Sequence, residues 1–425
     1  MAQTPMTLDG AIAQAIAHNP LLRVEHAAAD RAAAEVAEAR ASWFPRVSFS
    51  EGARRGDASV FVFSSLLAAQ RFTATNFAID MLNHPAAVTF YQRTLGVDQV
   101  LFDGGRTRAA SRLATGRREM ADASVVRAAA DLVVSVSQTY GRILSADAER
   151  HAAEAAIDAA REDMARAEHR RDVGTATDAD VLALSAYLAD VQQRGLRASG
   201  DAAIARAQLN RLIGVPITAD LVVVEPVPDA PASRDLSALI AEAEAARPEL
   251  ASASAAGRVA EAGLGAARAA WWPQVAGQAA YEQDGLAFAD RASSWTAGVE
   301  LRWSLSAGGA EIARMREAAA DVAQARASRD DVKEAIDEDV VSAVAREQSA
   351  HARLEAGRAA VTEARESQRI IRDRYDAGMA PMNDVLRAAS AVLEAERLRV
   401  TALVDALVAD AMLNRAIGRT SLPSR

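Results

Sequence analysis

The chain carries one sequence pattern twice, in two copies that align without gaps over long stretches. Pro20 returns as Pro248 at a shift of 228 residues, whereas Gly104 returns as Gly308 at a shift of 204. The first copy therefore contains an insertion of 24 residues between Pro45 and Gly104. Two long copies in a chain of 425 residues predict one duplicated architecture, and not the short-period stack of a solenoid.

Composition excludes several classes of protein. Half of the residues are hydrophobic, but no stretch reaches the ~20 consecutive apolar residues of a transmembrane helix. Because the chain has no cysteine, disulfides, thiolate chemistry and cysteine metal ligands are excluded. A net charge of −9 argues against a nucleic-acid partner. The first five residues lack the basic and apolar regions of a signal peptide, so the protein is either cytosolic or has lost such a peptide.

The aromatic residues are confined to two short windows. All five Trp and all nine Phe lie within residues 43–102 and 271–303. There, apolar residues alternate with polar ones, which is the period of a β-strand. From Trp295 to Leu305 every odd position is apolar and every even position is polar or glycine. Each copy is therefore predicted to contain one hairpin, with a long loop at about 55–89 in the first and a short loop at about 283–293 in the second.

Outside these windows the chain has the pattern of long helices. Apolar residues recur at helical spacing, as at Val136 and Tyr140. Residues 105–173 contain no proline, and a continuous helix of that length would extend for ~100 Å. Gly174 and Gly378 are predicted to end the two long helices, because glycine favours the left-handed conformation just past a helix.

These signals divide the chain into two structural repeats, 1–234 and 235–425. The first is predicted to hold a helix, the hairpin 45–102, the long helix 105–173, a helix over 177–213 and a linker. The second is predicted to hold a helix, the hairpin 273–305, the long helix 309–377, a helix over 382–417 and a tail.

The two hairpins, 45–102 and 273–305, supply only four strands. Four strands are too few to close a membrane barrel, which begins at about eight. Several chains must therefore share one barrel, whose strands would be apolar on the outside and polar toward the lumen. The long helices would extend that lumen beyond the membrane.

The order and spacing of these segments resemble the TolC-like outer-membrane efflux proteins over nearly the whole chain. The resemblance lies in the Asn19-Pro20 break, the Leu101–Arg106 junction, the paired reversals after Val173 and Ala377, and the Leu209–Gly214 ending. It implies a mainly α fold with a membrane β-barrel. In that fold, a duplicated long-helix tunnel protomer contributes four strands to a trimeric twelve-stranded barrel.

The resemblance also implies a function, a location and partners. The protein would be a passive outer-membrane exit duct of a tripartite efflux or type I secretion system that reaches into the periplasm, and its signal peptide would have been removed from this chain. Its partners would be two further copies in a homotrimer, a periplasmic adaptor (membrane fusion) protein, an inner-membrane pump and outer-membrane lipid. Because conduction is passive, neither catalytic residues nor a cofactor are expected. The exported cargo, whether drug, metal or polypeptide, is left open.

Particular residues gain roles from the same resemblance. Asp180 and Asp384 match acidic residues near the periplasmic aperture, and Tyr375 matches an aromatic residue that helps to hold the aperture shut. Where well-known members carry a gating arginine and a second aspartate, this chain has Ala380 and Arg387. Arg374 or Arg387 is therefore expected to pair with Asp180 or Asp384. The tip facing the adaptor would comprise Gly174, Thr175, Gly378 and Met379.

Simpler interpretations stand beside these. Gly174 and Gly378 cap helices in any case, and the helix dipole alone favours a carboxylate at Asp180 or Asp384. The six histidines show no metal-ligand spacing, so they are predicted to lie at the surface and no metal site is predicted. The rival class is a soluble, all-helical coiled-coil structural or adaptor protein. In water, however, its apolar strand faces would be an aggregation hazard.

Overall fold

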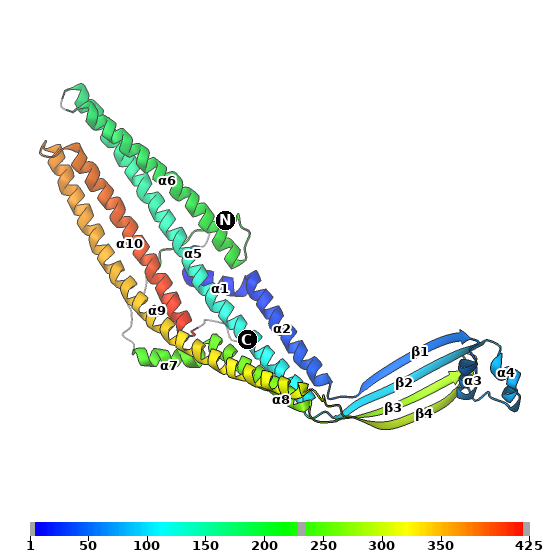
Figure 1. The fold of residues 1–425 in the computed structure, drawn as a ribbon. Coiled ribbons are helices and arrows are strands. Elements are labelled where there is room, and N and C mark those ends of the chain that lie inside the picture. Colours follow the sequence, from blue (N-terminus) through cyan, green and yellow to red (C-terminus); the bar gives the residue numbers. More distant parts are fainter. Residues whose placement is uncertain (1–4, 175, 228–234, 420–425) are drawn as a thin grey trace. The chain divides into compact units, whose positions relative to one another are not determined.

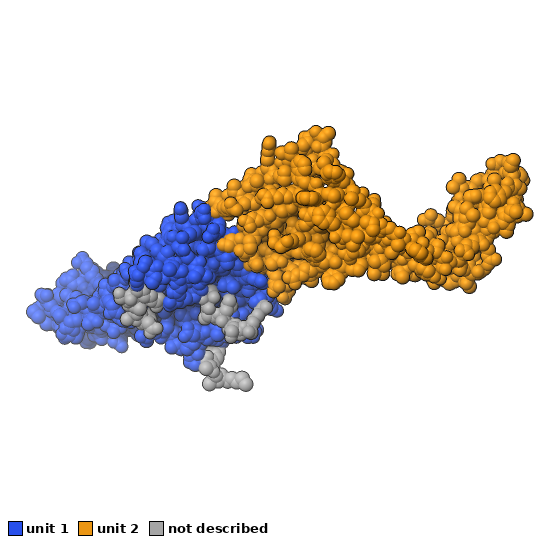
Figure 2. All heavy atoms as spheres, turned by 90° about the horizontal axis from the view of Figure 1, so that it is seen from below, with its two compact units in different colours: residues 1–29, 121–253, 329–425 blue, residues 30–120, 254–328 orange. Residues whose placement is uncertain are grey.

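A computed structural model describes residues 5–174, 176–227 and 235–419. The described chain divides into two compact units (Figure 2). Unit 1 contains residues 1–29, 121–253 and 329–425, and unit 2 contains residues 30–120 and 254–328. Each unit draws on both copies of the sequence pattern, so neither copy forms a compact unit of its own.

Unit 2 contains one antiparallel sheet with the strand order β1-β2-β3-β4 (Figure 1). The strands are β1 (Arg46–Gly56), β2 (Val88–Phe102), β3 (Gln274–Gly285) and β4 (Ala292–Arg302). The first and second hairpins therefore meet through β2 and β3, one strand from each copy. The long connection in the first hairpin is largely helical, with α3 (Ser59–Ala68), η1 (Ala74–Phe77) and α4 (Ile79–Asn83).

The register of the sheet aligns apolar residues in rows on one face. Phe49 is paired with Leu95, Leu95 with Tyr281, and Tyr281 with Trp295. These four side chains are 64%, 44%, 45% and 75% exposed in the single chain. The next residues along each strand point to the other face, where Ser50, Thr94, Glu282 and Ser294 form a polar row.

Two pairs of long helices supply most of unit 1 (Figure 1). In the first copy α5 (Arg106–Asp172) is followed by α6 (Asp178–Ile213), and in the second α9 (Ala310–Asp376) is followed by α10 (Met382–Ala416). The stripe predicted around Val136 and Tyr140 is fully buried, with 0% exposure at both. It packs in a core with Leu209 of α6 and Leu403 of α10. Among the described residues, no helix is long and apolar enough to cross a membrane.

The remaining helices begin and end at equivalent breaks. These helices are α1 (Leu8–His18), α2 (Pro20–Ala41), α7 (Leu236–Ala246) and α8 (Pro248–Ala269). Between α1 and α2, Asn19 Nδ2 donates a 2.8 Å hydrogen bond to the Leu212 carbonyl oxygen. Between α7 and α8, Arg247 Nη1 donates a 3.2 Å bond to the Ala416 carbonyl oxygen. The donors occupy matching positions in the two copies, as do the acceptors, so the duplicated breaks make the same contact with different side chains.

Candidate functional site

Within unit 1, the two long hairpins reverse at their helical tips. Gly174 follows α5 with a φ of 78°, and Gly378 follows α9 with a φ of 73°. The Gly174 amide donates 2.9 Å to the Arg171 carbonyl oxygen, and the Gly378 amide donates 2.9 Å to that of Tyr375. Left-handed glycines thus end both helices, as the sequence predicts. The predicted tip also includes Thr175 and Met379. Thr175 lies outside the described residues.

Asp180 is held in a capping box at the start of α6. The Thr177 amide donates 3.0 Å to Asp180 Oδ2, and the Thr177 hydroxyl donates 2.9 Å to the same oxygen. In return, the Asp180 amide donates 3.3 Å to the Thr177 hydroxyl. The carboxylate therefore fixes the first turn of α6, which leaves one of its oxygens, Oδ1, outside the box.

Asp384 occupies the matching place in α10 but has a different partner. Pro381 caps this helix without a side-chain hydrogen bond, and Arg387 Nη1 lies 3.6 Å from Asp384 Oδ1. Because the Arg387 side chain is 81% exposed, this ion pair is weak. Arg374 is exposed at the end of α9, and among the described residues it pairs with neither aspartate.

A small apolar cluster joins the two hairpins just behind the reversals. Its buried members are Ala167 of α5, Leu184 of α6, and Met382 and Val385 of α10. Tyr375 of α9 packs against this cluster. The guanidinium of Arg170 lies 5.1 Å from the centre of the Tyr375 ring, a cation–π contact that fixes the ring between α5 and α9.

Ion pairs between α5 and α9 reinforce the cluster, and sequence analysis did not find them. Arg372 Nη2 of α9 lies 2.7 Å from Asp163 Oδ1 of α5. Asp163 also binds Arg166, and this hydrogen bond raises the pKa of the Arg166 guanidinium. Arg170 Nη2 lies 3.3 Å from Asp376 Oδ1. These partners are about 200 residues apart, and the two pairs follow neither repeat shift, so the sequence carries no local signal for them.

One histidine contradicts the prediction that all six lie at the surface. His351 is only 8% exposed, and its Nε2 lies 2.9 Å from Asp410 Oδ1. It faces inward because α9 turns this side toward α10, where the facing residue is an aspartate. Metal-ligand motifs describe residues that lie close together in one segment. They therefore cannot reveal a pair that forms between two helices.

Long antiparallel helical hairpins, together with an open sheet that has one exposed apolar face, are the elements of an outer-membrane channel protein. The chain belongs to the outer membrane efflux protein family, whose pattern matches residues 11–215 and 239–419. The protein CyaE of Bordetella pertussis is 30% identical to it over 397 residues, which cover 92% of this chain and 79% of CyaE.

Solved structures show the same fold. The CmeC outer membrane channel of Campylobacter jejuni has a TM-score of 0.83 at 16% identity, with 97% of this chain and 86% of CmeC covered. The open state of the MtrE outer membrane channel of Neisseria gonorrhoeae has a TM-score of 0.79 at 19% identity, with 98% and 91% covered. The protein is therefore an outer-membrane exit duct with a periplasmic extension, and its relatives are channels rather than enzymes.

Proposed function

We propose that three copies of this chain form one duct, with twelve strands closing a barrel in the outer membrane. Substrates delivered by an inner-membrane pump would pass through the helical tunnel to the outside. The proposal extends the family's function to an assembly and to partners, and it involves no catalytic step. Whether the pump belongs to a drug-efflux or a type I secretion system is left open.

The exposed sheet carries this proposal. Among the described residues, β1 and β4 are each paired on one side only, and the apolar face of the sheet is largely exposed. A face with Trp295, Val299 and Leu301 exposed by 75%, 70% and 63% would aggregate in water. Lipid satisfies that face, and neighbouring copies satisfy the two edges, so assembly in a membrane removes both liabilities.

The helical tip is the proposed periplasmic aperture and docking site. Asp180 and Asp384 would come from each of three chains, so six carboxylates would give the narrow end a negative potential that favours cations. Tyr375, Arg374 and Arg387 would shape the closed state. A periplasmic adaptor would meet the exposed reversals around Gly174, Thr175, Gly378 and Met379.

Single-channel recording tests the proposal. Detergent-purified protein is added to a planar bilayer, and a trivalent cation is then added to one side at a time. We expect discrete, cation-selective steps that the trivalent cation blocks only from the side of the Asp180 and Asp384 tip. The double variant Asp180→Asn with Asp384→Asn should keep its conductance steps but lose most of the block.

The outcomes separate the parts of the proposal. Absence of conductance from protein that is folded and trimeric would overturn the duct itself. Conductance with equal block from both sides, or with block unchanged in the double variant, would overturn the assignment of the acidic aperture while leaving the duct in place.

A further inference from the structure

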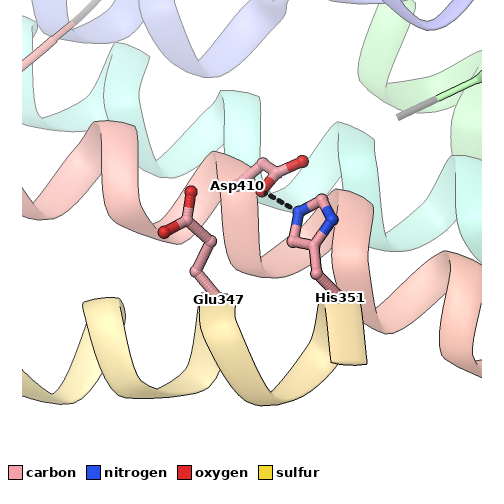
Figure 3. Close-up of side chains that lie close together, drawn as sticks. All are labelled: Glu347, His351 and Asp410. Atoms are coloured by element: carbon pink, nitrogen blue, oxygen red, sulfur yellow. Dashed lines mark hydrogen bonds and ion pairs between the residues drawn. The ribbon is translucent and has the colours of Figure 1, made fainter. Parts of the chain in front are cut away.

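Three potential metal ligands converge between α9 and α10 in unit 1. Glu347 and His351 lie one helical turn apart on α9, so their side chains share one face of that helix. Asp410 projects from α10 toward them (Figure 3). One carboxylate oxygen from each acid and one ring nitrogen of His351 all lie within 4.8 Å of one another. We propose that these residues bind a divalent transition-metal ion.

The burial of the cluster distinguishes it from an acidic surface patch. His351 is 8% exposed, and Glu347 and Asp410 are half-buried. A divalent cation placed between the carboxylates of Glu347 and Asp410 would be attracted by both. The hydrogen bond between His351 Nε2 and Asp410 Oδ1 holds the imidazole ring toward the same point (Figure 3).

An ion has a route to the cluster. Asp410 also lines a cavity of about 670 Å³ in unit 1, whose other walls include Asp9 and Ser137. The Asp410 side chain can therefore be reached by water and by dissolved ions from this cavity. Water from this cavity would complete the coordination shell, since three protein ligands leave at least one position open.

The ligand set selects the class of metal. One imidazole and two carboxylates suit Zn²⁺, Mn²⁺ or Ni²⁺, whereas Mg²⁺ and Ca²⁺ prefer oxygen ligands alone. Tetrahedral zinc ligands lie roughly 3.3 Å apart, given Zn–N and Zn–O distances of about 2.0–2.2 Å. The ligand atoms already lie within 4.8 Å of one another, so binding would require them to approach by roughly 1.5 Å at most. Of these metals, zinc is the ion to which we assign the site.

A bound ion would tie the two helices of the second hairpin together. The cluster joins α9 at Glu347 and His351 to α10 at Asp410, and it lies far along both helices from the reversal at Gly378. Binding to the folded chain alone raises the melting temperature by mass action. The site is thus a metal-dependent brace between helices, and it does not depend on the proposed duct.

Metal titration of the full chain in detergent tests the site. Protein dialysed against a chelator is titrated with ZnCl₂ alone, and binding is followed by calorimetry and by the melting temperature. We expect one saturable site per chain and a higher melting temperature with zinc, but no response to MgCl₂ at equal concentration. Replacement of Zn²⁺ by Co²⁺ should give visible absorption bands typical of nitrogen and oxygen ligation. This spectroscopic signature does not depend on stability.

Variants identify the ligands. Glu347→Gln, His351→Ala and Asp410→Asn should each weaken zinc binding by about ten-fold or more, because each removes a direct ligand. The control is His151→Ala, which removes an exposed histidine that lies 3.4 Å from Glu154. Glu347→Gln and Asp410→Asn preserve side-chain shape, so they remain informative if His351→Ala fails to fold.

Three results would overturn the site. The first is the absence of saturable zinc binding by the wild-type chain. The second is binding by folded Glu347→Gln and Asp410→Asn that equals the wild type. A matching loss in His151→Ala would assign the binding to surface histidines, and would equally refute the cluster between α9 and α10.

Discussion

At the scale of single residues, left-handed glycines differ in what surrounds them. Gly214 has a φ of 75°, and a Cβ there would lie 2.7 Å from the carbonyl oxygen of His18. Gly174 has a φ of 78°, but a Cβ there would meet nothing within 4 Å. The first glycine is required by both conformation and packing, whereas the second is required by conformation alone.

Alanine at these positions should therefore destabilise the protein unequally. Gly174→Ala should cost about 1–2 kcal/mol, the penalty for a left-handed non-glycine residue. Gly214→Ala should cost about 1–3 kcal/mol more, because the new methyl group must displace the end of α1. Melting temperatures of the two variants in detergent, measured side by side, check this order. Equal losses at both positions would show that α1 moves aside freely.

The Asp103 carboxylate should make the stability of the protein depend on pH. It accepts hydrogen bonds from the Gly105 amide at 2.9 Å, the Thr107 amide at 2.7 Å and the Thr107 hydroxyl at 2.6 Å. Partial burial alone would raise the pKa of the Asp103 carboxyl, but these hydrogen bonds outweigh burial and hold the pKa below its usual value. Protonation therefore favours the unfolded state, and the carboxylate stabilises the start of α5 at neutral pH.

The sign of the pH effect follows from the lowered pKa. The stabilisation by Asp103 is fully present above the unfolded pKa of about 3.9, and it is lost as the pH falls through the lower folded pKa. Between pH 7 and pH 3, the melting temperature of the wild type should fall further than that of Asp103→Asn. The variant keeps an acceptor oxygen but does not titrate. Parallel pH profiles for the two proteins would contradict this assignment.

At the residue scale, the sequence predicts caps better than partners. The glycines at 174 and 378 and a first-turn carboxylate at Asp180 are recognisable because a helix terminus favours those residue types locally. The bonds of Asn19 to Leu212 and of Arg372 to Asp163 are not recognisable, because each partner is brought near only by the packing of whole helices. For the same reason, the sequence does not reveal that His351 faces inward.

At the scale of elements, the alternating pattern of β4 predicts which face of the strand contacts lipid. Val299 belongs to the apolar face and Thr296 to the polar face of the same strand, and both are exposed in the single chain. Arginine on the lipid face of a membrane strand costs about 2–4 kcal/mol near the midplane. Val299→Arg should therefore reduce assembly into lipid vesicles strongly, whereas Thr296→Arg should reduce it little.

Protease protection after reconstitution into vesicles measures this difference. The two variants add the same charge to one strand, three residues apart, so a general effect of arginine on folding is controlled. Similar protection of both would mean that the faces of β4 are not distinguished by lipid, and would remove the membrane assignment of this sheet.

The ion pairs between α5 and α9 predict a change in the resting conductance of the proposed aperture. Asp163 binds Arg372 of α9 as well as Arg166 of its own helix. Asp163→Asn removes the charge that holds both, so the hairpins should separate more often and the resting conductance should rise several-fold. Asp158→Asn is the control, because Asp158 pairs with Arg161 of its own helix and is 77% exposed. Single-channel recordings without an adaptor compare the two variants. Equal resting conductance in both would show that the ion pairs between α5 and α9 do not restrict the resting conductance.

At the scale of the whole molecule, the duplication could be predicted, but its spatial consequence could not. Residue periodicity predicts a hairpin in 45–102 and another in 273–305, and the four strands lie within these limits. The pairing of β2 with β3 joins the copies into one sheet, and both compact units mix segments of both copies. No local pattern encodes this mixing, because it arises from contacts between segments that are about 200 residues apart.

The two edge strands of the sheet predict the subunit arrangement. Within the part of the chain that the structure describes, β1 and β4 are unpaired on their outer sides, so in a closed barrel β1 of one copy should pair with β4 of the next. Since the chain contains no cysteine, introduced cysteines give an unambiguous readout. Ser48→Cys on β1 can be combined in turn with Ser294→Cys, Thr296→Cys or Gly298→Cys on β4, which samples three registers of one face.

Oxidation of the correct pair should produce covalent dimers and trimers, but no larger species, on a non-reducing gel. The control pair is Thr94→Cys with Glu282→Cys, which lie opposite one another within the chain and should form a bridge that leaves the protein monomeric on the same gel. A ring closed by three copies explains why the ladder stops at the trimer, because the third bridge uses the last free edge. A ladder that continues beyond three, or monomers alone from every pair, would contradict a barrel shared by three chains.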